Sequence, residues 1–310
     1  LCWSATSLPV LLLGRLIQGI GVAAPRIVTT AIVRDRHHGR DMAYIMSMVM
    51  GVFILVPAIA PSIGQYIIHV ADWRAIFLFY IVAAFGGALW AATRLEESLP
   101  IPMRRPFHLG TILRGMGEAA RTRVTFGYTI CSGLAFGALL GYLNSSQQIF
   151  QDMFHAGERF AIYFGLLALA IGCAFFSNSA LVRRLGMRRI TRTALCALVA
   201  IACVYLLHLL AFGPHLLSFM LFAAASFFCL GLSFGNMNAM GLEPMGHMAG
   251  LASAFMGAFS SALSLALGTF IGQLYNGTLL PLALGFLLLS TSALLAMQWT
   301  ERRFPFTPSP

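Results

Sequence analysis

The chain has 310 residues, of which 59% are hydrophobic and only 10% are charged, and its mean hydropathy is +0.82. A soluble chain of this size carries about 25% charged residues, so soluble enzymes, disordered scaffolds and nucleic-acid readers are excluded as classes. The net charge of +10 comes from 20 arginines and no lysine, clustered in short loops between apolar runs. This pattern indicates membrane topology, so we predict an all-α, polytopic protein of the lipid bilayer without a nucleic-acid partner.

Nine apolar runs are long enough to cross a bilayer, which takes about 20 mostly apolar residues. They cover residues 8–33, 42–69, 74–94, 124–147, 159–182, 190–212, 215–242, 249–275 and 279–299. The Arg-rich loops alternate along the chain with loops that hold only Arg74 and Arg159. The positive-inside rule therefore predicts that the first helix enters from outside and that the C-terminus is cytoplasmic.

The polar stretch from Glu96 to Thr122 divides the chain, and its second part, His108 to Arg121, is amphipathic enough to lie along the membrane surface. We predict four parts. Residues 1–95 are the remainder of an N-terminal bundle with three spans, 96–122 a cytoplasmic central loop, 123–300 a C-terminal six-helix bundle and 301–310 a cytoplasmic tail. Because Leu1 is not an initiator Met, we expect the chain to begin partway through a longer protein.

Arg15 is the main functional candidate in the first span, because an Arg within a spanning helix costs about 2.5 to 3.5 kcal/mol on insertion scales. Gln18, Val22 and Arg26 fall on the same helix face. This stripe predicts a water-filled path through the protein. The alternative is that Arg15 snorkels to the outer interface and Arg26 to the inner one.

Small and kinking residues lie beside this stripe and in the second span. Gly19 and Gly21 are small enough to let another helix approach closely. Pro57 and Pro61, together with Gly64, predict a bend in the second span, which suits gating as well as packing.

Apolar and amide side chains elsewhere form a candidate substrate cavity, which is richer in Met and Phe than in hydroxyl groups. Its candidate residues are Met46, Met50, Phe136, Tyr142 and Asn236. Such side chains suit adaptable apolar ligands, although Asn236 is equally compatible with a hydrogen bond between helices. The sequence has no acid pair, Ser/His/Asp arrangement or metal-binding motif, so we expect neither an enzyme nor a metal site.

Several motifs together resemble one transporter family. The string Leu11-x-x-x-Arg15-x-x-Gln18-Gly19-x-Gly21-x-Ala23 closely resembles the fourth-helix motif of the drug:proton antiporters in the major facilitator superfamily. The stretches 32–35, 73–77, 96–100 and 246–254 are similar to the Bcr/CflA branch of multidrug efflux transporters. The resemblance covers essentially the whole chain.

This resemblance implies a major facilitator-like helical bundle in which the nine spans are helices four to twelve of twelve. It implies that Arg15 is the buried Arg linked to proton coupling, that Gln18 is its cavity neighbour, and that Pro61 and Gly64 belong to the antiporter motif of helix five. It also makes the loop from Arg183 to Arg189 the second-half copy of a cytoplasmic loop motif, without that motif's Asp. The residues of this copy are Arg184, Gly186, Arg188 and Arg189.

The leading functional hypothesis is therefore export of small hydrophobic drugs or metabolites across a bacterial inner membrane by proton antiport and alternating access. The expected partners are a small-molecule substrate and the lipid bilayer, and the expected state is a monomer. The proton gradient supplies the coupling, without any cofactor. Two alternatives stay open: transport of a defined metabolite such as a sugar or nucleoside, and a truncated remnant that does not transport.

Overall fold

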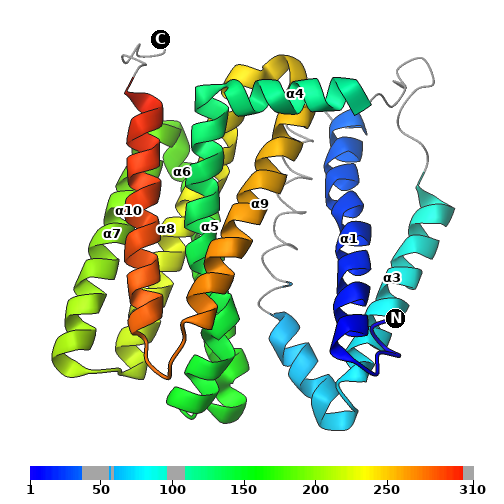
Figure 1. Ribbon diagram of the computed structural model, residues 1–310, viewed down its shortest axis with the longest axis vertical. Coiled ribbons are helices and arrows are strands. Elements are labelled where there is room, and N and C mark those ends of the chain that lie inside the picture. The colour runs from blue at the N-terminus through cyan, green and yellow to red at the C-terminus, as the bar shows by residue number, and fades with distance from the viewer. Residues whose placement is uncertain (37–55, 57–58, 96–108, 303–310) are drawn as a thin grey trace. The chain divides into compact units, whose positions relative to one another are not determined.

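The computed structural model describes residues 1–36, 56, 59–95 and 109–302. Its chain divides into two compact units, Leu1–Phe107 and His108–Pro310, whose helices are labelled in Figure 1. Every regular element among the described residues is a helix. This confirms the predicted all-α fold class.

In the first unit, the described helices follow the predicted spans closely. α1 covers Leu8–Arg36 and continues through Pro25, and α3 covers Arg74–Arg94. Residues 59–70 are also helical, whereas most of the second predicted span, including Pro57, Met46 and Met50, lies outside the described residues. Both α1 and α3 start where long apolar runs start, because each such run can satisfy its backbone hydrogen bonds only within a helix once it is in hydrocarbon.

In the second unit, a short helix precedes six long ones. They are α4 (Leu109–Arg121), α5 (Arg123–Gln148), α6 (Phe160–Leu185), α7 (Met187–Phe212), α8 (Leu216–Leu242), α9 (Ala249–Gln273) and α10 (Leu280–Glu301). A π-helical turn, Ile149–Met153, extends α5, and a 3₁₀ segment, Glu243–Met248, joins α8 to α9. The six long helices lie within a few residues of the predicted spans.

α5 and α9 pack closely through small residues that recur every four positions. These residues are Gly133, Gly137 and Gly141 on α5, and Ser264, Gly268 and Gly272 on α9. A Cβ added at Gly133 would lie 2.8 Å from Leu263 Cδ2, and one added at Gly272 would lie 2.7 Å from Asn144 Cβ. Residues four apart share one face of a helix, so the glycines form a groove that admits the facing backbone.

α4 is the amphipathic helix that the sequence predicts near His108–Arg121. Ala119 is fully buried, while Arg114 and Arg121 are exposed. At Gly115 the helix meets Leu251 and Met248 closely enough that a Cβ would clash with Leu251. The apolar side of α4 therefore packs on the start of α9, and its arginines face away from this contact.

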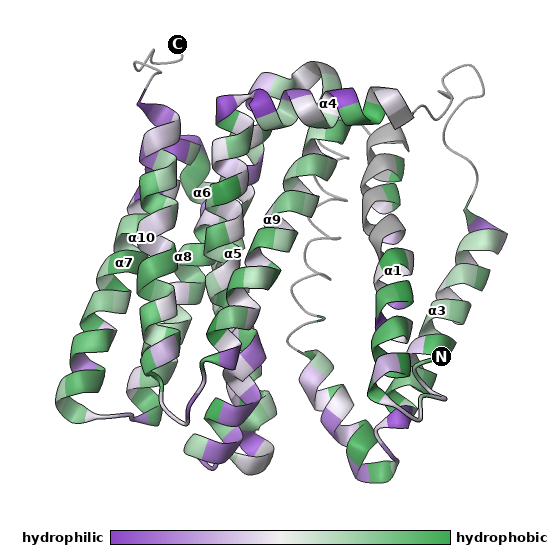
Figure 2. Cartoon of the chain, in the orientation of Figure 1, coloured by the Kyte–Doolittle hydropathy of each residue, from purple (hydrophilic) through white to green (hydrophobic). Residues whose placement is uncertain are grey.

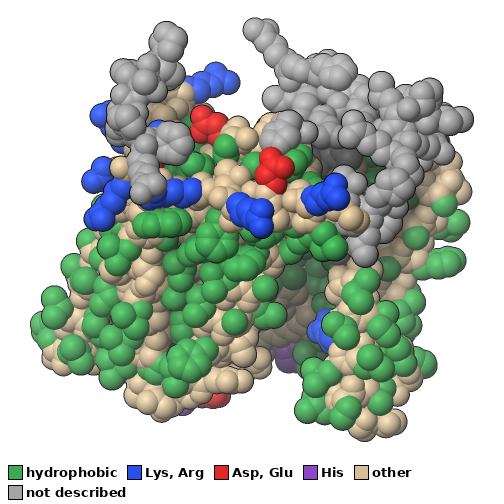
Figure 3. Space-filling model, turned by 45° about the horizontal axis from the view of Figure 1, so that its top comes forward, with side chains coloured by type: hydrophobic (Ala, Val, Ile, Leu, Met, Phe, Trp, Pro, Cys, Tyr) green, Lys and Arg blue, Asp and Glu red, His purple; other side chains and the backbone are tan. Residues whose placement is uncertain are grey.

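The surface of the second unit is typical of a membrane protein. Figure 2 shows hydrophobic residues along the middle of the helices and hydrophilic residues toward their ends. Many large apolar side chains are exposed on it, as for Leu207 at 67% and Phe176 at 72%. Arginine side chains gather at the end of the unit where α4 lies, as the blue side chains in Figure 3 show. Seven helices among the described residues are long and apolar enough to cross a bilayer, and α1 adds a shorter apolar stretch, Leu8–Val22.

Candidate functional site

Arg15 lies two turns into α1, and its side chain is exposed, whereas the resemblance implies a buried one. Its guanidinium contacts two neutral groups. Arg15 Nη1 donates a hydrogen bond of 3.1 Å to Gln18 Oε1. The guanidinium carbon also lies 5.0 Å from the centre of the Phe77 ring, which belongs to α3. The first contact follows from the spacing, since residues three apart are neighbours on a helix surface. The contact with Phe77 joins α1 to α3, and the spacing of residues in the sequence does not predict it.

Phe77 is held in place by two aromatic neighbours, Tyr80 on α3 and Trp73 at the N-cap of that helix. Its side chain is 8% exposed. The Trp73 ring meets it edge to face at a centroid distance of 5.9 Å, and the Tyr80 ring does so at 6.3 Å. These pairs have the edge-to-face arrangement that aromatic rings prefer.

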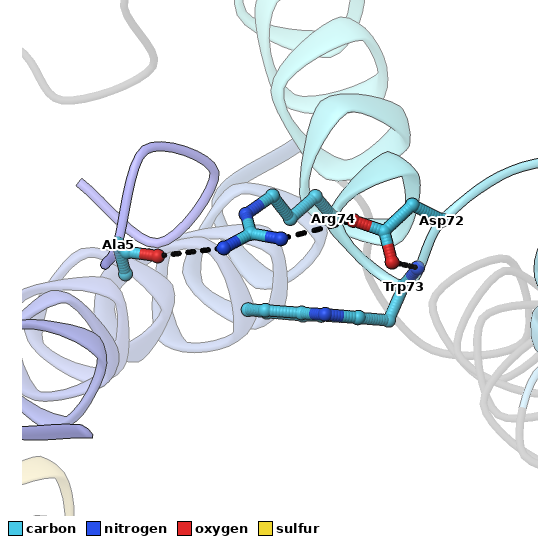
Figure 4. A network of polar contacts seen from close by, with 4 residues as sticks. All are labelled: Ala5, Asp72, Trp73 and Arg74. Atoms are coloured by element: carbon cyan, nitrogen blue, oxygen red, sulfur yellow. Dashed lines mark hydrogen bonds and ion pairs between the residues drawn. The ribbon is translucent and has the colours of Figure 1, made fainter. Parts of the chain in front are cut away.

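A polar network fixes the start of α3 next to these rings (Figure 4). The Asp72 carboxylate accepts a hydrogen bond of 2.8 Å from the Trp73 backbone N–H, and it forms an ion pair with Arg74 Nη1 at 3.0 Å. Arg74 Nη2 donates a hydrogen bond of 3.2 Å to the Ala5 carbonyl. The guanidinium carbon of Arg74 lies 4.5 Å from the centre of the Trp73 ring. The network therefore ties the segment before α1 to the first turn of α3.

A cavity of about 280 Å³ lies between α1, α3 and the segment that precedes α1. Gln18 and Phe77, the two partners of Arg15, both line it, and Trp3 and Tyr80 add aromatic walls. The lining is therefore mostly apolar, and Gln18, Tyr80, Trp3 and Cys2 are the lining residues whose side chains carry a polar atom. Such a lining suits an apolar ligand with a few hydrogen-bonding groups.

The rest of the predicted stripe is only partly described. Val22 is 63% exposed. The side chain of Arg26, which the alternative places at the inner interface, lies outside the described residues. Near the stripe, Gly19, Gly21 and Gly64 have no described atom within 4 Å of the place that a Cβ would take. The close helix approach predicted at Gly19 and Gly21 is thus absent among the described residues, and the described part of the chain shows it instead between α5 and α9. Pro61 and Gly64 lie within helical residues 59–70, whereas Pro57, the other proline of the predicted bend, lies outside the described residues.

The cavity candidates in the second unit have different surroundings. Phe136 is 38% exposed on α5 and meets the Phe234 ring of α8 edge to face at 5.5 Å. Tyr142 is only 1% exposed and lies among phenylalanine rings, of which Phe227 is nearest at 4.9 Å. Tyr142 therefore belongs to the packed core of this unit rather than to an open surface, because its ring fills the space between α5 and α8.

Asn236 pairs with Asn178 across α6 and α8. Asn236 Nδ2 donates a hydrogen bond of 2.8 Å to Asn178 Oδ1, and Asn178 Nδ2 donates one of 3.2 Å to Asn236 Oδ1. Asn236 Nδ2 also donates 2.8 Å to the Leu232 carbonyl. Asn236 is 3% exposed. The geometry therefore matches the alternative reading of Asn236 as an interhelical hydrogen bond.

The predicted loop motif forms the tight connection from α6 to α7. Gly186 joins the two helices with φ 76° and ψ 151°, a conformation essentially restricted to glycine. Arg184 lies in the last turn of α6 and Arg189 in the first turn of α7, and both are exposed. Arg188 lies 4.0 Å from the Glu243 carboxylate. The motif thus places its arginines at one end of the unit.

Long apolar helices, with most of the arginines near their ends, define this chain as a multi-pass membrane protein. The described residues hold no group of three His, Cys, Asp or Glu side chains arranged to bind a metal. The profile of the Major Facilitator Superfamily matches residues 1–269. The chain belongs to this superfamily.

Curated relatives include one uncharacterized transporter and proteins named for drug resistance. The chain is 28% identical over 284 residues to the uncharacterized MFS-type transporter YdgK of Bacillus subtilis (strain 168), covering 88% of this chain and 67% of the relative. It is 25% identical over 277 residues to a bicyclomycin resistance protein homolog of Haemophilus influenzae, covering 86% and 67%. It is 29% identical over 250 residues to the multidrug resistance protein MdtL of Shewanella oneidensis, covering 79% and 61%.

These matches confirm the predicted resemblance to the Bcr/CflA-type efflux branch of the superfamily. The chain spans about two thirds of the length of the curated relatives it matches. Sequence reasoning identified Arg15 and Gln18 but missed Phe77, because a contact between two helices that are each apolar on most faces leaves no periodic signal.

Proposed function

We propose that the protein is a secondary active transporter that exports small hydrophobic compounds across a bacterial inner membrane in exchange for protons. The carrying observation is the Arg15–Gln18 pair, a positive charge that is hydrogen-bonded to an amide on the surface of the apolar stretch Leu8–Val22. The relatives named for bicyclomycin and multidrug resistance support a drug as the exported compound. The proposal is therefore transport rather than catalysis.

The charge of Arg15 gives the proposal its physical mechanism. An arginine stays protonated at any physiological pH, so it cannot itself carry the exchanged proton. It acts through its field, because a nearby positive charge favours the ionised form of a carboxyl group and disfavours a cationic ligand. Proton and drug then bind best to different conformations, and the gradient of one drives the other.

The arginine distribution supports an orientation for this transporter. The arginines of the described second unit, apart from Arg159 before α6, gather at the end where α4 lies (Figure 3), and the loop from Arg183 to Arg189 contributes to this end. Arginine-rich ends are retained on the cytoplasmic side during insertion. We therefore place this end, and the C-terminus after α10, in the cytoplasm.

Substitution of Arg15 tests the role assigned to it. The gene is expressed in a host that lacks its own drug exporters, and export is followed for a panel of lipophilic dyes that includes ethidium and rhodamine 6G. We expect Arg15→Ala to lower export of the best-exported dye at least about ten-fold. Arg15→Lys falls between, because an ammonium group lacks the planar fork that bonds Gln18 and stacks on Phe77.

Arg159→Ala is the matched control, since Arg159 is an exposed arginine in the second unit. Its export should equal that of the wild type. Unchanged export by Arg15→Ala at normal abundance in the membrane contradicts the role of Arg15. Absence of export of every dye by the wild type contradicts the proposed function itself.

A further inference from the structure

We propose that Phe77 is a positioning residue that holds the Arg15 guanidinium in place by a cation–π contact between α1 and α3. The inference rests on the proposed function, because it explains how the charge that serves transport is kept at one position. It is carried by the contact itself, with the guanidinium carbon 5.0 Å from the centre of the Phe77 ring. A cation within about 6 Å of a ring centre is attracted by the ring quadrupole.

The two partners of Arg15 hold the guanidinium without cancelling its charge. Gln18 accepts one hydrogen bond and Phe77 offers a ring face, and both side chains are neutral. Within the described part of the chain, no carboxylate pairs with Arg15. These two described partners therefore leave the positive charge of Arg15 unneutralised, which an ion pair would not do.

Phe77 can serve as a fixed support because it is itself locked in place. Trp73 meets its ring edge to face at 5.9 Å, and Arg74 lies over the Trp73 ring at 4.5 Å. Arg74 is in turn bonded to Asp72 and to the Ala5 carbonyl (Figure 4). A continuous series of contacts thus runs from Arg74 through the Trp73 and Phe77 rings to Arg15, whose side chain is exposed.

The ring, rather than apolar volume alone, is the property that the inference requires. Leucine at position 77 keeps the site apolar but has no quadrupole, whereas tyrosine and tryptophan keep a ring face. We expect Phe77→Leu to lower dye export about three- to ten-fold. Phe77→Tyr and Phe77→Trp should retain at least about half of it.

Phe85→Leu is the matched control, because Phe85 lies on the same helix and is 69% exposed. It makes the same substitution without touching Arg15 and should export as the wild type does. A double-mutant cycle of Phe77→Leu with Arg15→Gln, read from the thermal stability of the purified protein, measures the contact independently of transport. The double variant should lose less stability than the two single variants together.

Each outcome decides the matter. Coupling in stability together with rescue of export by Tyr and Trp supports the positioning role. Additive stability losses, full export by Phe77→Leu, or equal failure of all three replacements overturns it. Coupling in stability with full export by Arg15→Gln overturns the transport role of Arg15 and, with it, the positioning role of Phe77, while the contact itself stands.

Discussion

The amide pair of Asn178 and Asn236 shows how a single buried polar contact joins two helices of the second unit. Each amide donates to the other, and Asn236 also reaches the Leu232 carbonyl. Asn236 is buried and Asn178 is half-buried, so the loss of one amide removes a hydrogen-bond partner that water replaces only in part for the other. The pair therefore contributes to the register of α6 against α8.

Replacing one amide of the pair should destabilise the protein nearly as much as replacing both. We expect Asn236→Leu to lower the stability of the protein by about 1–3 kcal/mol, because the Asn178 amide loses its partner. Adding Asn178→Leu should cost little more or even restore part of the loss. Thermal unfolding of the purified variants in detergent measures this.

Asn238→Leu is the control for that measurement, since Asn238 lies on the same helix with an exposed side chain. It should change stability by less than about 0.5 kcal/mol. Additive losses from the two asparagine substitutions would show that the amides do not depend on each other.

The residue scale also marks the limit of sequence reasoning about the site. The contact of Arg15 with Gln18 is predictable, because both lie on one helix at a fixed spacing. The placement of Tyr142 in the core is not, because α5 is apolar around most of its circumference and its sequence does not say which face is covered. The same reason hides Phe77, whose partner lies about sixty residues away in the chain.

At the scale of elements, hydrophobic run length predicts the helices well and their packing poorly. A run of about 20 apolar residues must form a helix in hydrocarbon, so the bounds of α3 and of the second-unit helices follow from composition. The helix–helix contacts depend on which faces meet. The glycines at every fourth position of α5 are a readable signal for a close contact, but only the structure identifies α9 as the partner.

The α5–α9 contact leads to a prediction at Gly268. A Cβ there would clash with Leu140 and lie 3.0 Å from the backbone nitrogen of Gly141. Because a backbone atom cannot move aside as a flexible side chain can, we expect Gly268→Ala to destabilise the protein by about 1–3 kcal/mol. Thermal unfolding in detergent is again the measurement.

Gly257→Ala provides the comparison on the same helix, because no described atom lies within 4 Å of its added Cβ. It should leave stability unchanged or raise it by up to about 1 kcal/mol, since alanine favours helix more than glycine does. Equal effects at the two glycines would contradict the close packing of α5 on α9.

At the scale of the whole molecule, composition and charge already indicate the class of protein, and the helices and the superfamily match confirm it. The two units differ in what they offer the proposed mechanism. The first carries the fixed charge of Arg15 with its neutral supports, and the second carries the glycine-packed α5–α9 pair and the arginine-rich end. The proposed mechanism requires both, because in that proposal a charge that biases protonation serves export only if conformational change links it to the drug.

Exchange of protons for drug in a purified system tests the central claim most directly. The protein is reconstituted into liposomes that contain a pH-sensitive dye, and the best-exported compound of the dye panel is added with and without an imposed pH gradient. We predict that an acidic lumen drives uptake of the compound above its equilibrium level and that the lumen becomes more alkaline as it enters. Uptake that is indifferent to the pH gradient, with no change in luminal pH, would contradict proton antiport.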